Sequence, residues 1–255
     1  MNRLDEIFAR DETALVTYLC AGDPSVDESL PLFQALADAG ADVLEIGVPF
    51  SDPGADGPAI QRSAERALAS GATLEKVLEM TGKIQGDSAK VLFGYLNPFL
   101  SYGYERLAAR CVEVGIHGLL VVDCPPEEEP ELRAALDSRN IHPILLIAPT
   151  TPDDRIAALG PSAGGFAYYV SMAGVTGAAF QGGQALVDRI ARVRKLAGLP
   201  VAVGFGIATP QDAASVASGA DGVVVGSALV RIVEAHGVNA AAELSKLTAA
   251  LKAAI

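Results

Sequence analysis

A chain of 255 residues with 50% hydrophobic and only 20% charged residues can bury the core of one large α/β domain, which we predict to span 1–255. Its net charge of −12 argues against nucleic acid as a partner, because affinity for phosphate backbones comes from clustered lysine and arginine. The first ten residues form no apolar targeting segment and no apolar run reaches about 18 residues, so we expect a cytoplasmic protein without a membrane partner.

Apolar strands and amphipathic helices alternate along the first half of the chain. An amphipathic opening over 3–10 precedes a strand over 14–20 that ends in a Gly-Asp-Pro turn. In chain order, the pattern then predicts a helix over 27–39, a strand over 43–47, helices over 58–70 and 73–85, a strand over 90–95, a helix over 103–114 and a strand over 118–122.

The second half repeats this alternation, with one long loop of small residues. The pattern predicts a helix over 127–140, a strand over 142–147, a helix over 153–159, a strand over 165–171, a helix over 185–197, a strand over 200–205, a helix starting at Thr209-Pro210, a strand over 223–225 and helices over 228–233 and 240–254. Because long irregular loops in compact domains are usually functional, we expect the loop over 172–183 to be a lid.

A weak internal repeat indicates the fold class. At 39–44, 114–119 and 218–223, a glycine-capped helix end leads directly into an apolar strand. Strand and helix units repeated over about 250 residues are typical of a (β/α)8 TIM barrel. We predict this barrel with an extra N-terminal helix and a short phosphate-binding helix after strand 8. The alternative is a doubly wound open sheet, but no G-x-G-x-x-G motif follows the first strand.

Cysteine and histidine positions indicate neither a disulfide framework nor a metal site. The cysteines are odd in number, lie far apart and form no Cys-x-x-Cys pair (Cys20, Cys111 and Cys124). The histidines fall at expected strand starts or in the tail and lack the spacing of metal ligands (His117, His142 and His236). We therefore expect reduced cysteines and no metal ion.

Glu45 is an acid inside an otherwise apolar strand. Side chains alternate along a strand, so Val43, Glu45 and Gly47 share the face opposite to Leu44 and Ile46. If the apolar pair meets the helices, Glu45 points into the barrel. A buried lone carboxyl has a raised pKa, which suits a general acid or base. The alternative is a buried ion pair with a lysine or arginine.

Acids also follow the strands at the edge where such barrels carry their chemistry. Asp52 and Asp56 share the Pro/Gly-rich loop after the second strand, and Asp123 follows the fourth. As an alternative, each residue could have a local structural role, with Asp52-Pro53 forming a turn and Asp56-Gly57-Pro58 leading into a helix. Crowding of two acids and three prolines beside a buried glutamate favours a catalytic role for Asp56.

Glycines after the last two strands predict a phosphate site. Gly204-Phe205-Gly206-Ile207 follows the seventh strand and Gly226-Ser227 follows the eighth. In TIM barrels these loops and the start of a short extra helix commonly bind phosphate through backbone N–H groups. Each glycine alone could equally be a turn, and their paired position favours phosphate.

The segment 44–57, LEIGVPFSDPGADG, closely resembles the signature of tryptophan synthase alpha chains. The resemblance continues through AGDP at 21–24, DCPPE at 123–127, GVTG at 174–177, GFGI at 204–207 and GS at 226–227, and thus covers essentially the whole chain. The sequence departs from many members of the family at Gly54, where a bulky aliphatic residue is common, and at Met172-Ala173, where a basic residue is common.

The resemblance implies a lyase that cleaves indole-3-glycerol phosphate by a retro-aldol reaction into indole and glyceraldehyde 3-phosphate. Glu45 would be the acid and base, and Asp56 would stay anionic near the indole nitrogen. The resemblance further implies a tryptophan synthase beta chain as partner in an alpha2beta2 heterotetramer, with pyridoxal phosphate in the beta chain and no cofactor in this one.

The resemblance also implies ligand contacts. Gly177, Gly206, Gly226 and Ser227 would hold the phosphate, and Tyr18, Phe93, Leu120 and Tyr168 would line the indole slot. For Phe93 and Leu120, a place in the barrel core is an equal alternative. Tyr168 would also hydrogen-bond near Glu45, and Thr176 would close the lid over Asp56.

Three other functions remain open from the sequence. Another phosphate-binding barrel, such as a sugar-phosphate epimerase or isomerase, would share the glycine loops but usually uses a metal or a different acid–base pair. A binding module would only dock on and activate a partner. A stand-alone lyase would release free indole without any beta chain.

Overall fold

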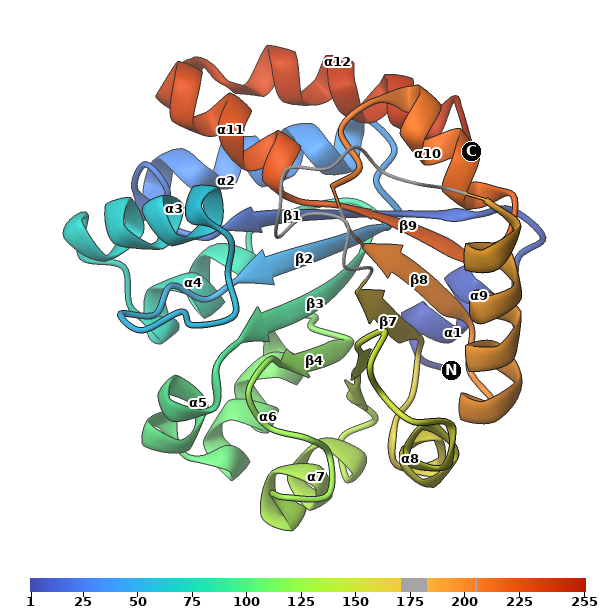
Figure 1. The fold of residues 1–255 in the computed structure, drawn as a ribbon. Helices are drawn as coiled ribbons and strands as arrows, with labels where there is room; N and C mark the ends of the chain where they lie inside the picture. Colours follow the sequence, from blue (N-terminus) through green and yellow to red (C-terminus); the bar gives the residue numbers. More distant parts are fainter. Residues whose placement is uncertain (171–182, 205) are drawn as a thin grey trace.

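Parallel strands form the centre of the computed structural model of the chain, and helices surround them (Figure 1). The structure describes residues 1–170, 183–204 and 206–255. Within these ranges the strands are β1 (Ala14–Cys20), β2 (Val43–Gly47), β3 (Ala89–Gly94), β4 (Gly118–Val121), β5 (His142–Pro143), β6 (Leu145–Ile147), β7 (Ala167–Val170), β8 (Val201–Gly204) and β9 (Gly222–Val225).

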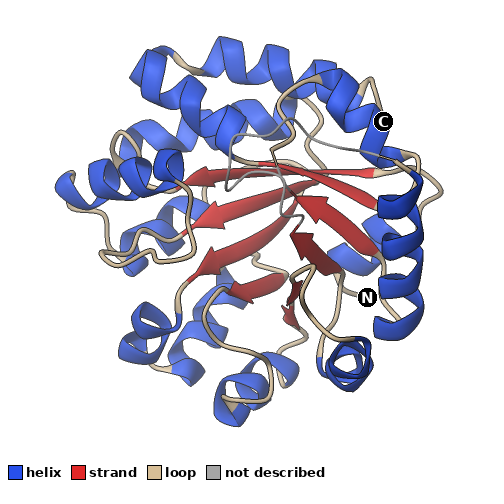
Figure 2. Ribbon diagram, in the orientation of Figure 1, coloured by secondary structure: helices blue, strands red, loops and turns tan. Residues whose placement is uncertain are grey.

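Helices surround these strands (Figure 2). They are α1 (Arg3–Phe8), α2 (Val26–Asp38), α3 (Pro58–Ala69), α4 (Leu74–Thr81), α5 (Leu96–Tyr102), α6 (Tyr104–Glu113), α7 (Pro130–Asp137), α8 (Asp153–Leu159), α9 (Gln184–Ala197), α10 (Pro210–Ala217), α11 (Ser227–His236) and α12 (Ala241–Lys252), with short 3-10 helices at Gly160–Ser162 and Gly237–Asn239. Among the described residues, no helix is both long enough and apolar enough to cross a membrane.

The strands make a parallel sheet that curls into a barrel. Their order is β5-β4-β3-β2-β1-β9-β8-β7-β6. The two outermost strands, β5 and β6, are separated in sequence by Ile144 alone, so the chain itself joins the two edges of the sheet. Together β5 and β6 occupy the fifth of eight barrel positions, and the predicted (β/α)8 barrel is confirmed.

The strand predicted over 142–147 is thus broken into two pieces. Pro143 has no N–H to give to a ladder. The N–H of Ile144 still reaches the Leu119 carbonyl on the β4 side at 2.9 Å, whereas Leu145 already pairs with Ala167 of β7. The break therefore lies where the chain passes from one neighbouring strand to the other.

Alternation along the strands separates a barrel interior from a layer beneath the helices. Leu44 and Ile46 of β2 belong to the large cluster that includes the helix faces. The interior cluster takes inward residues from around the barrel (Ala14, Val16, Val43, Ala89, Val91, Leu120, Ile144, Phe166, Ala202 and Val224). Leu4 and Ile7 of α1 belong to the interior cluster as well. The predicted extra N-terminal helix is therefore confirmed, and it packs against the interior.

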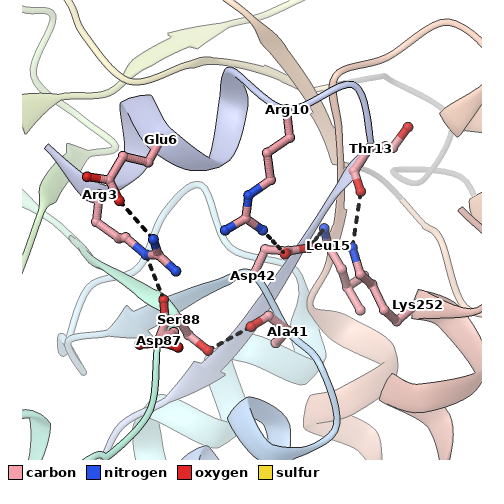
Figure 3. A network of polar contacts seen from close by, with 10 residues as sticks. All are labelled: Arg3, Glu6, Arg10, Thr13, Leu15, Ala41, Asp42, Asp87, Ser88 and Lys252. Atoms are coloured by element: carbon pink, nitrogen blue, oxygen red, sulfur yellow. Dashed lines mark hydrogen bonds and ion pairs between the residues drawn. The ribbon is translucent and has the colours of Figure 1, made fainter. Parts of the chain in front are cut away.

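An ionic network ties both ends of the chain to the barrel (Figure 3). Asp42, which precedes β2, accepts hydrogen bonds from the Leu15 N–H at 2.8 Å and from Lys252 Nζ of α12 at 2.8 Å. Arg10, which follows α1, reaches the same carboxylate at 3.4 Å. The network lies at the amino-terminal ends of the strands and so stabilises the end opposite to the βα loops.

Most helices differ from their predicted bounds by one or two residues, and the helix predicted over 73–85 ends at Thr81. Three other helices show larger differences. The helix predicted over 127–140 begins only at Pro130, because proline favours the first helical position and keeps Glu129 before it out of the helical region, at φ −124° and ψ 75°. Helix α5 was not predicted, and the Asp123 carboxylate accepts the N–H of its first residue, Leu96, at 2.8 Å. The helix expected over 228–233 is longer and runs over Ser227–His236.

Candidate active site

Glu45 points into the barrel, as strand alternation predicted. It lies on β2 opposite Tyr18 of β1 and Val91 of β3, and it is 1% exposed. Its Oε1 atom has no hydrogen-bond partner among the described residues. Burial raises the pKa of Glu45 to about 8, with no opposing cation. The carboxyl therefore carries a proton at pH 7, and the alternative of a buried ion pair is not supported by the described residues.

Asp56 lies in the loop between β2 and α3, and the loop backbone is held in place by hydrogen bonds. The N–H of Ala55 donates to the Tyr95 hydroxyl at 3.0 Å, and the side-chain amide of Gln61 donates to the backbone carbonyl of Asp56 at 2.9 Å. Burial raises the pKa of the Asp56 carboxyl to about 6, and a hydrogen bond with Tyr95 acts in the opposite direction. Asp56 is therefore mostly ionised at pH 7.

Two interior tyrosines lie within electrostatic reach of both acids. The pKa of Tyr168 is raised first by burial and then by the charges of Glu45 and Asp56. The same two carboxyls, together with burial and the Cys20 thiol, raise the pKa of Tyr18. Glu45 and Asp56 thus face the same region, at the carboxyl-terminal ends of the strands.

Comparisons with known proteins show the family of the chain. The family model described as tryptophan synthase alpha chain matches residues 4–255. The chain belongs to the tryptophan synthase alpha chain family. A member from Pelobacter propionicus is 46% identical over 262 residues, covering 100% of this chain and 98% of the relative.

Solved structures of tryptophan synthase agree with the fold. The alpha chain from Legionella pneumophila superposes with a TM-score of 0.90 at 37% identity, covering 100% of this chain and 97% of the other. Tryptophan synthase from M. tuberculosis, in an open form, gives a TM-score of 0.89 at 35% identity, covering 100% and 99%.

As a member of this family, the chain is a lyase that cleaves indole-3-glycerol phosphate to indole and glyceraldehyde 3-phosphate in tryptophan biosynthesis. Membership of this family decides against the epimerase or isomerase and against a module that only binds. Among the described residues, no group of three or more histidine, cysteine, aspartate or glutamate side chains could hold a metal ion.

The described residues of the predicted phosphate site follow two neighbouring strands, β8 and β9. Gly206 has φ +62°, and, apart from its chain neighbours, no described atom lies within 4 Å of the place where its Cβ would be. Ser227 is the first residue of α11, and Gly226 before it provides no side-chain cap for the helix. The first N–H groups of α11 are therefore available to an anion. Phe205 lies outside the described residues.

The predicted indole contacts occupy different depths of the barrel. Phe93 is partly buried and meets the Tyr18 ring edge to face, with centroids 5.2 Å apart. Leu120 is fully buried in the interior cluster, as its alternative core role requires. Tyr168 lies near Glu45, but no hydrogen bond between their side chains is found among the described residues.

The predicted lid cannot be compared with the structure. Thr176, Gly177 and the departure at Met172-Ala173 all lie outside the described residues. The other departure, Gly54, has no atom within 4 Å of its would-be Cβ, so nothing in the described loop requires a glycine there.

Sequence reasoning missed Tyr95. This residue directly follows β3 as the N-cap of α5, is buried, and stacks on Phe50 at a centroid distance of 5.3 Å. Its hydroxyl holds the Asp56 loop through Ala55. The sequence signal was a tyrosine directly after an apolar strand, at the edge where the βα loops meet, but its partner loop is 40 residues away. Asp123, by contrast, has the structural role of binding the first N–H of α5.

Proposed function

We propose that Glu45 and Asp56 divide the acid–base work of indole-3-glycerol phosphate cleavage. The observation that carries this proposal is the buried, protonated Glu45 carboxyl, whose Oε1 has no described partner, facing the same region as an ionised Asp56. The two environments hold the pKa values apart, at about 8 and about 6. Such a split assigns the proton donor and the anion.

Glu45 moves the protons of the bond-breaking step. Its carboxyl donates a proton to indole C3, which prepares the bond between C3 and the glycerol chain for cleavage. The resulting carboxylate takes the proton of the adjacent glycerol hydroxyl as that carbon becomes the aldehyde. The bonding electrons return to the indole ring, and Glu45 ends the cycle protonated.

Asp56 stabilises the charge that this step creates. Protonation at C3 makes the indole N–H cationic, and a fixed carboxylate beside it lowers the energy of that state. Tyr95 keeps the loop in place through the Ala55 N–H. We propose that Gly206, Gly226 and Ser227 hold the phosphate together with Gly177, and that Thr176 closes the lid over Asp56.

Membership of the family supports a proposal for the assembly and the location. We propose that the chain, folded as one domain over 1–255, works in the cytoplasm as the alpha subunit of an alpha2beta2 complex with a tryptophan synthase beta chain. The acid–base mechanism needs no cofactor in this chain, and pyridoxal phosphate belongs to the beta chain.

Indole release tests the proposed activity and the dependence on the partner. The purified chain is expected to release indole from indole-3-glycerol phosphate, at a rate that a beta chain increases. A chelator is expected to leave the rate unchanged. Equal rates with and without a beta chain would mean a stand-alone lyase, and no indole release in either case would contradict the function.

Replacing Tyr95 by phenylalanine tests how Asp56 is kept ionised. The variant loses a hydrogen bond that lowers the pKa of Asp56, so this pKa should rise above about 6. The acid limb of kcat/KM should then move to higher pH, and at pH 6 the loss should be about three- to tenfold. An acid limb identical to that of the unchanged protein would contradict this role of Tyr95.

A further inference from the structure

The Tyr18 side chain lies between the two ends of the proposed site, the phosphate loop and the acid pair. Tyr18 lies on β1, is 6% exposed and is paired with Glu45 in the β1–β2 register. The would-be Cβ of Gly226 lies 3.4 Å from the Tyr18 Cβ, and that of Gly47 lies 2.4 Å from the Tyr18 hydroxyl. The ring therefore runs from the phosphate loop to the end of β2, where the Asp56 loop begins.

The position of the hydroxyl depends on the glycine at the end of β2. Any side chain at position 47 would collide with the Tyr18 hydroxyl and ring, because real Cβ contacts are longer than 2.4 Å. The opposite side of the barrel repeats this arrangement, since a Cβ at Gly204 would lie 2.2 Å from the Tyr168 hydroxyl. Each of these two glycines, Gly47 and Gly204, leaves room for one tyrosine hydroxyl.

The Tyr18 hydroxyl has no hydrogen-bond partner within the described part of the chain. No described side chain or backbone group lies within bonding geometry of it, and the shift of its pKa arises from burial and from charges at a distance. That shift is upward, so the hydroxyl stays protonated and can donate. A hydroxyl that keeps its proton and has no described acceptor is free to donate to an oxygen that arrives with the ligand.

The shape of the substrate supplies that partner. With its phosphate at Gly226 and Ser227 and its reacting carbon between Glu45 and Asp56, indole-3-glycerol phosphate must lay its glycerol chain along Tyr18. We propose that the Tyr18 hydroxyl donates a hydrogen bond to an oxygen of this chain and so selects a hydroxylated chain over a plain alkyl chain. This inference rests on the proposed function, since it uses the placement of the two substrate ends.

Tyr18→Phe tests the proposal, because it removes the hydroxyl and keeps the ring. Two constants are measured with the chain in complex with a beta chain: kcat/KM for indole-3-glycerol phosphate, and the inhibition constant of indol-3-ylpropyl phosphate, which has the same skeleton without chain hydroxyls. We expect kcat/KM to fall about three- to tenfold and the inhibition constant to change less than about twofold.

Three outcomes would overturn the proposal. Equal losses for both ligands would mean that Tyr18 only shapes the slot. A shifted alkaline limb of the pH profile with no change in discrimination between the ligands would mean that the hydroxyl acts on Glu45. Unchanged constants would also overturn it, while the activity itself would stand. The unchanged protein failing to cleave the substrate would instead contradict the proposed function.

Tyr169→Phe is the matched control. Tyr169 is the neighbour of Tyr168 on β7, is 4% exposed and faces the helix layer and not the barrel interior. Its replacement removes one hydroxyl from a buried tyrosine outside the site. We expect both constants to stay within about twofold of the original values. Melting temperatures of both variants show whether each one is folded.

Discussion

Glu45→Gln is expected to lower kcat for indole release by about 10³-fold, within the range typical of a lost general acid and base. Glutamine has the shape of the protonated glutamate that burial favours here, so the barrel interior should keep its packing. It cannot give up or accept the proton, however. KM should change little, because the loss falls on the transition state and not on substrate binding.

The pH profile of the unchanged protein provides a second readout of Glu45. Since the carboxyl must be protonated to donate, kcat/KM should fall on the alkaline side with an apparent pKa of about 8. A lone acid limb, with full activity well above pH 9, would contradict the assignment. Glu65→Gln, an exposed position on α3, is the control for loss of one carboxylate from the same region of the fold.

The difference in stability between Glu45→Gln and the unchanged protein should depend on pH, because Glu45 binds a proton more tightly in the folded chain. The ordinary pKa of the glutamate is 4.5 and burial raises it to about 8, so between these values the folded chain holds a proton that the unfolded chain has released. This contribution to stability is full below pH 4.5 and is lost as the pH rises towards 8. Glu45→Gln should therefore gain stability relative to the unchanged protein between pH 5 and pH 8, measured by denaturant unfolding.

Local pattern was enough to predict the scaffold and the orientation of Glu45. Alternation along 43–47 depends only on the pleat of a strand, and the glycine-capped helix ends recur because each helix returns directly to a strand. Both features are properties of adjacent residues. The same holds for the helix over Asp153–Leu159, whose predicted bounds agree with the structure.

Features that depend on contacts between distant segments could not be predicted in this way. Helix α5 begins where the Asp123 carboxylate of the next βα loop accepts the Leu96 N–H, and the Asp56 loop is held by Tyr95, the residue after β3. The break at Ile144 reflects a change of neighbouring strand. The position of the Tyr18 hydroxyl likewise depends on Gly47 of another strand, which no local pattern reveals.

Asp56→Asn should lower kcat by about 10²- to 10³-fold, the usual effect of removing one group that stabilises transition-state charge. Asparagine keeps the size of the side chain and removes only the negative charge that balances the cationic indole N–H. The acid limb of kcat/KM in the unchanged protein should have an apparent pKa of about 6, set by this carboxyl, and should be absent from the residual activity of the variant.

The contrast with Asp52→Asn makes the test specific to position. Asp52 lies in the same loop, is exposed, and its carboxylate accepts a hydrogen bond only from the neighbouring Ser51 hydroxyl, at 2.6 Å, among the described residues. Both substitutions remove one charge from one loop, so an effect of net charge on an anionic substrate would appear in both. Because only Asp56 lies within reach of the interior tyrosines, only its loss should abolish the acid limb. Equal losses in the two variants would contradict the role given to Asp56.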